Sequence, residues 1–187
     1  MSRSLAIISL LFMLTINTVQ AEDMQKLNQE AKQLIMQFAS VLKPALKQAL
    51  QTQGPAAAIK VCSEIAPQTA QQIATDSGWQ VKRVSLKARN HTSAIPDAFE
   101  TKVLEMFEHR LFEGEAIVDM KHSEVTDGTF RFMKPQGTEK VCLTCHGKEI
   151  KPEIKQALAE YFPQDKATGY TLGEIRGAFS LQKTLKE

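Results

Sequence analysis

The stretch EVTDGTFRFMKP, residues 124–135, carries the clearest structural signal in this chain. Its Asp127-Gly128 dipeptide is typical of a tight two-residue turn between antiparallel strands. Strand-forming residues flank this turn on both sides, and they predict one strand over 116–125 and another over 129–135. The stretch is therefore expected to form a β-hairpin.

Helical patterns lie on both sides of this hairpin in the sequence. Residues 22–53 have an apolar stripe at helical spacing, which predicts a long amphipathic helix. The stripe either docks onto its own domain or pairs with a second copy, and docking is the interpretation we favour. A second helix is expected to begin at Gly54-Pro55 and to be interrupted at Pro67. A third begins around Pro96, and a short one covers 152–162.

Two further strands complete the predicted set, over 79–86 and 174–185. Gly177 lies inside the second of these, where a glycine indicates a bulge or a close backbone approach. Strands linked by a hairpin and mixed with flanking helices predict an α+β fold.

Length, composition and the pattern of the first 21 residues together predict one exported domain. The chain has 187 residues and a net charge of +2, which provides no extended basic field for nucleic acid. Residues 1–21 have the organisation of a cleavable signal peptide, with Arg3, an apolar run over 5–16 and small residues in Val19-Gln20-Ala21. The run is short for a membrane span, so an uncleaved anchor is the disfavoured alternative. We expect a single periplasmic domain over 22–187, without stable membrane insertion after cleavage.

The chemistry of the chain is concentrated in Cys142-Leu143-Thr144-Cys145-His146, the C-x-x-C-H pattern of covalent c-type haem attachment. Two thiols three residues apart can each form a thioether with one vinyl group on the same edge of a porphyrin. The adjacent imidazole can then ligate the iron. The motif therefore predicts one haem c, attached through Cys142 and Cys145, with His146 as the proximal ligand.

Three other interpretations of the cysteine pair are weaker. A structural zinc site needs four ligands, and the chain has only one C-x-x-C pair. A thioredoxin-type dithiol should open a helix after a strand, whereas this pair precedes Gly147 and Pro152. A plain disulfide leaves the adjacent His146 unexplained. Haem attachment accounts for both cysteines and the histidine together.

Cys62 is the cysteine outside the motif, and its helical phase places it on an apolar face. One interpretation is a buried bystander, because free cysteine is often buried. We favour the second interpretation, in which the inward thiolate is the distal iron ligand and the metal stabilises it. His91, His109, His122 or a methionine are the remaining candidates for that position.

Short motifs in a fixed order accompany the haem motif from Gly54 to Ser180. They are AIKVC (58–62) with AP (66–67), RVSLK (83–87) with RN (89–90), PD (96–97) with Glu100, FRFMKP (130–135), Tyr170, Gly173 and IRGA (175–178). In these motifs the chain resembles the periplasmic c-type haem-binding domains with a PAS-like fold, a family long known only as a domain of unknown function.

The resemblance implies a half-open antiparallel sheet with helices over it, and a haem between sheet and helices. It also implies a role in sensing or relaying redox state, and it singles out Cys62 in its own motif. The family pattern Arg-Asn-Pro-x-Asn is replaced here by residues 89–93, RNHTS. The missing proline is expected to loosen this loop.

A bound haem brings two propionates, which need cationic or hydrogen-bonding partners when they are buried. The candidates are Arg83, Arg89, Asn90 and Arg131. Three apolar residues of the hairpin would line the face of the ring, or would belong to the ordinary core: Phe130, Phe132 and Met133.

These residues favour a redox or small-ligand sensor that acts through an unidentified redox or signalling partner. The long N-terminal helix would transmit the signal, and it could also form a homodimer. The alternative is a periplasmic electron carrier. A His/thiolate pair would hold the ferric iron at low potential, whereas a His/Met pair would raise the potential towards that of carriers. No acid–base pair supports an enzyme, so we expect none.

Overall fold

A computed structural model describes the backbone of residues 3–185 and the side chains of residues 23–185. The predicted signal peptide, residues 1–21, therefore lies outside the described side chains, and its first two residues lie outside the described backbone. Within the part that is described, no helix is both long and apolar enough to cross a membrane.

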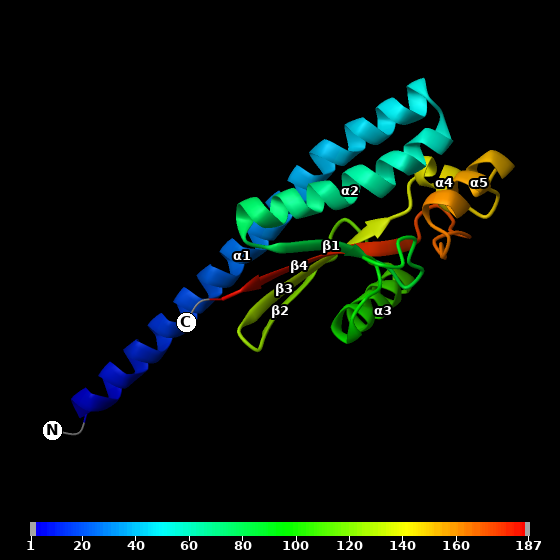
Figure 1. Ribbon diagram of the computed structural model, residues 1–187. Coiled ribbons are helices and arrows are strands. Elements are labelled where there is room, and N and C mark those ends of the chain that lie inside the picture. Colours follow the sequence, from blue (N-terminus) through cyan, green and yellow to red (C-terminus); the bar gives the residue numbers. More distant parts are fainter. Residues whose placement is uncertain (1–2, 186–187) are drawn as a thin grey trace.

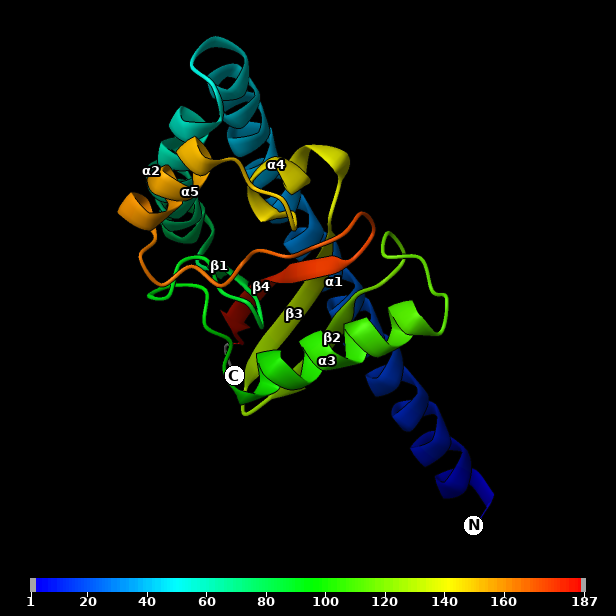
Figure 2. The ribbon, with the colours of Figure 1, turned by 90° about the vertical axis from the view of Figure 1, so that its right-hand side faces the viewer.

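Antiparallel strands form one sheet in the order β1-β4-β3-β2, and helices cover both of its faces (Figures 1 and 2). The strands are β1 (Gln80–Val84), β2 (His122–Thr126), β3 (Thr129–Gly137) and β4 (Ile175–Thr184). The helices are α1 (Arg3–Thr52), α2 (Pro55–Ser77), α3 (Ala98–Phe112), the 3₁₀ turn η1 (Lys140–Cys142), α4 (Leu143–His146) and α5 (Pro152–Tyr161). This arrangement confirms the predicted α+β fold.

Helices α1 and α2 run side by side along one face of the sheet, and α3 covers the other (Figure 1). The first face is closed by a cluster that contains Leu34, Phe38 and Leu42 from α1 and Phe179 and Leu181 from β4. The rings of Phe38 and Phe179 meet edge to face, with their centroids 5.2 Å apart. The stripe of the long helix therefore docks onto its own domain, as predicted.

The turns and helix starts follow the local sequence. Asp127 and Gly128 have φ angles of 50° and 68°, the two positive values that a type I′ hairpin turn requires. Asp97 caps α3: its side chain accepts from the Glu100 N–H, and the Glu100 side chain accepts from the Asp97 N–H. The predicted hairpin and third helix are both confirmed.

Three predicted boundaries are wrong. The first helix begins at Arg3 rather than at residue 22, because residues 3–43 contain no glycine or proline that would stop it. Pro67 lies inside α2 without ending it, since packing on both sides of the proline holds the helix together. Residues 116–121 turn instead of extending, and the Lys134 ammonium group donates to two carbonyls of that turn.

Candidate functional site

The C-x-x-C-H motif folds into η1 and α4, two short turns that follow β3 directly. The Gly147 N–H donates to the Leu143 carbonyl at 2.9 Å and closes α4. A Cβ atom at Gly147 would meet that carbonyl, so this position needs a glycine. Cys142 and Cys145 are half-buried free thiols on one short segment. The segment thus presents both sulfurs and the following imidazole from a single loop.

The His146 ring is held in one tautomer. Its Nδ1 atom lies 2.8 Å from the Ala167 carbonyl oxygen, so Nδ1 carries the hydrogen and Nε2 keeps its lone pair. Burial lowers the pKa of His146 to about 2, and the nearby cations Arg89 and Arg176 act in the same direction. The imidazole is therefore neutral, which is the state that ligates a metal.

Arg89 fixes the motif to the loop over 165–167. Its guanidinium pairs with the Asp165 carboxylate, with Nη2 and Oδ2 3.2 Å apart. The same Nη2 donates to the Ala167 carbonyl at 3.0 Å and to the Cys145 carbonyl. Nη1 lies 3.3 Å from Nε2 of His146. This side chain therefore positions the loop that carries the ligand candidate.

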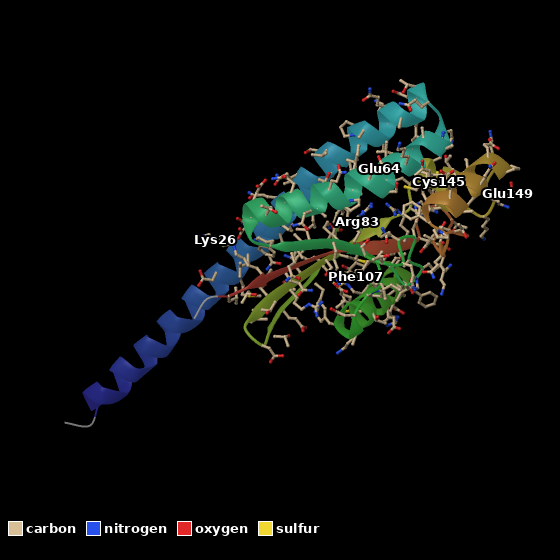
Figure 3. All side chains as sticks on the ribbon, in the orientation of Figure 1. Lys26, Glu64, Arg83, Phe107, Cys145 and Glu149 are labelled. Carbon is tan, nitrogen blue, oxygen red and sulfur yellow. The ribbon has the colours of Figure 1, made fainter. Side chains whose placement is uncertain are left out.

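Cys62 faces the same region from α2. One turn earlier on that helix, Ile59 packs with Ile154 of α5 in a cluster that Cys145 joins. Figure 3 shows Cys145 close to α2 and α5. Burial raises the pKa of the Cys145 thiol, and a negative charge on Cys62 would act in the same direction. Cys62 thus lies on the helix that packs, through Ile59, against the cluster that contains Cys145.

A bulge in β4 places Arg176 next to the end of β1. Gln136 pairs with Gly177, and Gly137 pairs with Ile175, so Arg176 is the extra residue on its strand. Gly177 has a φ angle of 151°, and a Cβ atom there would collide with the Val84 carbonyl. The predicted close approach at this glycine is confirmed.

Gly177→Ala is expected to lower the free energy of unfolding by about 1–3 kcal/mol, because alanine disfavours this φ angle and would push β1 and β4 apart. Urea denaturation followed by circular dichroism measures the loss. Gly128→Ala is the matched comparison, since its φ angle is also positive but nothing lies within 4 Å of the added Cβ. Equal losses in the two variants would contradict the collision argument.

Some predicted site residues lie elsewhere. Arg131 pairs with Asp97, with Nη2 and Oδ2 2.6 Å apart, and its guanidinium covers the Phe99 ring. The three apolar hairpin residues are fully buried in clusters that contain no motif residue: Phe130 and Phe132 below α1 and α2, and Met133 below α3. Alternation along β3 sends these side chains to opposite faces of the sheet, so they cannot line one ring together.

The loop that lacks the family's proline is closed in another way. The Asn90 side-chain oxygen accepts from the N–H groups of Thr92 and Ser93 at 3.0 and 3.1 Å. The Asn90 carbonyl also accepts from the Ala94 N–H at 2.9 Å. The expected loosening is therefore offset by this turn, which uses the side-chain oxygen of Asn90; the amide nitrogen is the atom that could donate to a propionate.

The other histidines have no recorded contact with the motif among the described residues. His91 and His109 are exposed. His122 is half-buried, and its Nε2 lies 3.2 Å from a Glu124 carboxylate oxygen. Within the described residues, no group of three or more His, Cys, Asp or Glu side chains is placed to hold a bare metal ion.

Sequence comparison places this arrangement in a known family. The family model described as Tll0287-like matches residues 16–183. The chain belongs to the Tll0287-like family. In fold it is similar to the crystal structure of the cyanobacterial haem protein Tll0287, with a TM-score of 0.63 and 24% identity over 89% of this chain and 97% of that one. No curated protein matches the sequence.

Two features of this Tll0287-like site were missed by the sequence reasoning. Asp165 binds Arg89, and the Ala167 carbonyl accepts from His146. Both partners lie about 20 residues after the motif in the sequence, so no local pattern reveals them. Arg176 belongs to the IRGA motif (175–178), but it was not identified as a site residue from the sequence. A charged residue directly before a glycine inside a strand is the signal that could have identified it, because a bulge there redirects the charge.

Proposed function

We propose that this protein is an exported, mono-haem, c-type protein of PAS-like fold that senses redox state or a small ligand through its haem. One observation carries the proposal. The two free thiols of the C-x-x-C-H motif share a short segment with an imidazole whose Nε2 lone pair is set by the Nδ1 hydrogen bond to Ala167. The haem protein Tll0287, which has the same fold, gives independent support.

The residues present fit a covalent haem. Each thiol of Cys142 and Cys145 would add across one vinyl group, so that S–H and C=C become C–S and C–H and nothing leaves. Nε2 of His146 would ligate the iron, and Cys62 would supply the sixth ligand. The buried Nε atom of Arg176 has no hydrogen-bond partner, as expected where a charged group is still to be received. The bound haem would supply a one-electron iron couple.

The chain's own residues would prepare this site. Asp165 holds Arg89, and Arg89 holds the Cys145 carbonyl, so the attachment loop keeps its shape. The Ala167 carbonyl orients the His146 ring and makes Nε2 a stronger ligand. Helices α2 and α5 cover the Cys145 thiol through their shared apolar cluster and so limit access of water to it. Arg89 must release Nε2 when the iron takes that position.

The sensing role rests on the position of Cys62. This residue lies on α2, and α2 packs along α1, so release of a Cys62 ligand would act on the long helix pair. A separate redox or signalling protein would read the change, and α1 could also pair with a second copy. The electron carrier is the second candidate. Val141, beside Cys142, is 53% exposed, which offers an apolar contact at the motif for a docking partner.

The first test is the product made with a c-type haem maturation system. We expect a red periplasmic protein that begins at Glu22 and is heavier than the processed polypeptide by one haem, and mass spectrometry measures this. The control is the double variant Cys142→Ser/Cys145→Ser, which should fold but carry no covalent haem. A colourless wild-type protein of unmodified mass would contradict the proposal.

The second test concerns the sixth ligand. Cys62→Ser is expected to abolish the low-spin ferric thiolate signature in electron paramagnetic resonance and to raise the reduction potential, since the thiolate stabilises ferric iron. Ser63→Ala, at the next position on α2, should leave both unchanged. A thiolate signature that persists in Cys62→Ser would remove this residue from the iron. Stopped-flow measurements of haem reduction separate the two roles. Rapid reduction that is not accompanied by a structural change would favour the electron carrier.

A further inference from the structure

Two arginines beside the motif stand out by having no anionic partner. Ion pairs to carboxylates are found for Arg89, Arg110 and Arg131. Among the described side chains, no such pair is found for Arg83 or Arg176. Both are at least half-buried, and the Nε atom of Arg176 is buried without any hydrogen-bond partner. A guanidinium in such a position normally has a counter-charge.

Arg83 reaches this place from β1, at the edge of the sheet. It lies on β1, opposite Phe179 of β4, and its guanidinium stands over the Phe38 ring of α1 at 5.3 Å from the ring centroid. Figure 3 shows Arg83 between α2 and β1. The side chain is therefore on the face of the sheet that α1 and α2 cover.

Arg176 lies beside the end of β1 because of the bulge. Ile175 and Ala178 both pack into the cluster below α3, so the extra residue between them breaks the alternation of β4. The Ser85 hydroxyl donates to the Arg176 carbonyl at 2.7 Å and holds the bulge against the end of β1. Residues 83–85 and 175–177 are thus neighbours, and each segment contributes one unpaired guanidinium.

Haem chemistry indicates which anion this pair would receive. A haem carries its two propionates on the porphyrin edge opposite the vinyl groups, so a haem joined to Cys142 and Cys145 would need its carboxylate partners at some distance from these thiols. Arg89, the arginine at the motif itself, is already occupied by Asp165. We propose that Arg83 and Arg176 form the carboxylate site for a haem propionate. This inference rests on the proposed function.

The haem-loaded protein tests this directly. Arg83→Gln and Arg176→Gln are compared with Arg110→Gln, whose guanidinium pairs with Glu115 on the surface. Each of the first two variants is expected to shift the propionate bands in redox-difference infrared spectra and the propionate bending modes in resonance Raman spectra. Both should also lower the reduction potential, because loss of a nearby positive charge favours ferric iron. Arg110→Gln should change neither.

Arg176→Lys separates charge from shape. We expect it to keep most of the potential but still to shift the propionate bands, because one ammonium replaces a two-donor fork. Unchanged bands in both glutamine variants would overturn the assignment. Saturable binding of inorganic phosphate to the haem-loaded protein, lost in Arg176→Gln, would also overturn it, since the site would then be open to a free anion. If the wild type carries no haem by mass, the proposed function itself fails.

Discussion

Glu100→Ala is expected to lower the free energy of unfolding by about 3 kcal/mol, because it removes a fully buried carboxylate that several groups share. Glu100 accepts from the Ser180 hydroxyl and lies 2.9 Å from the Lys82 ammonium group. It also caps the start of α3 and lies 3.5 Å from the Arg131 guanidinium. One side chain thus joins α3 to strands β1, β3 and β4.

Two matched variants define what this carboxylate does. Glu100→Gln keeps an acceptor for Ser180 and for the helix cap, so we expect a smaller loss of about 1–2 kcal/mol. Glu105→Ala removes an exposed carboxylate from the same helix and should change stability by less than about 0.5 kcal/mol. Guanidinium denaturation followed by circular dichroism compares the three. A loss in Glu100→Ala no larger than that in Glu105→Ala would show that the buried contacts contribute nothing.

Arg89→Ala is expected to cost about 3 kcal/mol and to reduce the yield of covalent haem. The change leaves Asp165, whose side chain is 9% exposed, without its cation and frees the Cys145 carbonyl. The attachment loop then loses its link to residues 165–167. Arg89→Lys should restore little, because an ammonium group cannot reach the carboxylate and two carbonyls together. Chemical denaturation and the haem content per polypeptide are the two measurements.

A double-mutant cycle shows whether Arg89 and Asp165 act as one unit. We expect Asp165→Ala to cost nearly as much as Arg89→Ala, and the double variant to cost little more than either, with a coupling of about 2 kcal/mol. Lys166→Ala changes an exposed neighbour in the same loop and is the control. Additive losses in the cycle would show that the two side chains stabilise the protein independently.

The parts of the fold that were predicted correctly depend on neighbours in the sequence. The Asp127-Gly128 turn requires positive φ angles at both residues, and the capping box of α3 joins residues three positions apart. Gly177 was predicted to mark a bulge or close approach because a strand rarely tolerates glycine without such a reason. Each of these features is a short-range effect that one sequence displays.

The candidates for propionate binding and haem lining depend on contacts between distant segments, which local sequence does not display. Arg131 was assigned to a propionate from its charge, but β3 directs it towards Asp97 at the start of α3. Phe130, Phe132 and Met133 were grouped as one lining, but alternation sends them to opposite faces of the sheet. The face of the sheet on which a side chain lies depends on its position in the strand. The pairing of β3 with β2 and β4 fixes these positions.

The sequence by itself predicted the covalent attachment that we propose, because the C-x-x-C-H motif places two thiols and an imidazole within five residues. It also determined the hairpin, the helix starts and the α+β class. Only the tertiary structure decided which charges are satisfied. Asp165 neutralises Arg89, whereas Arg83 on β1 and Arg176 in the bulge of the neighbouring β4 have no ion pair among the described side chains. This follows from strand order and the bulge rather than from spacing along the chain.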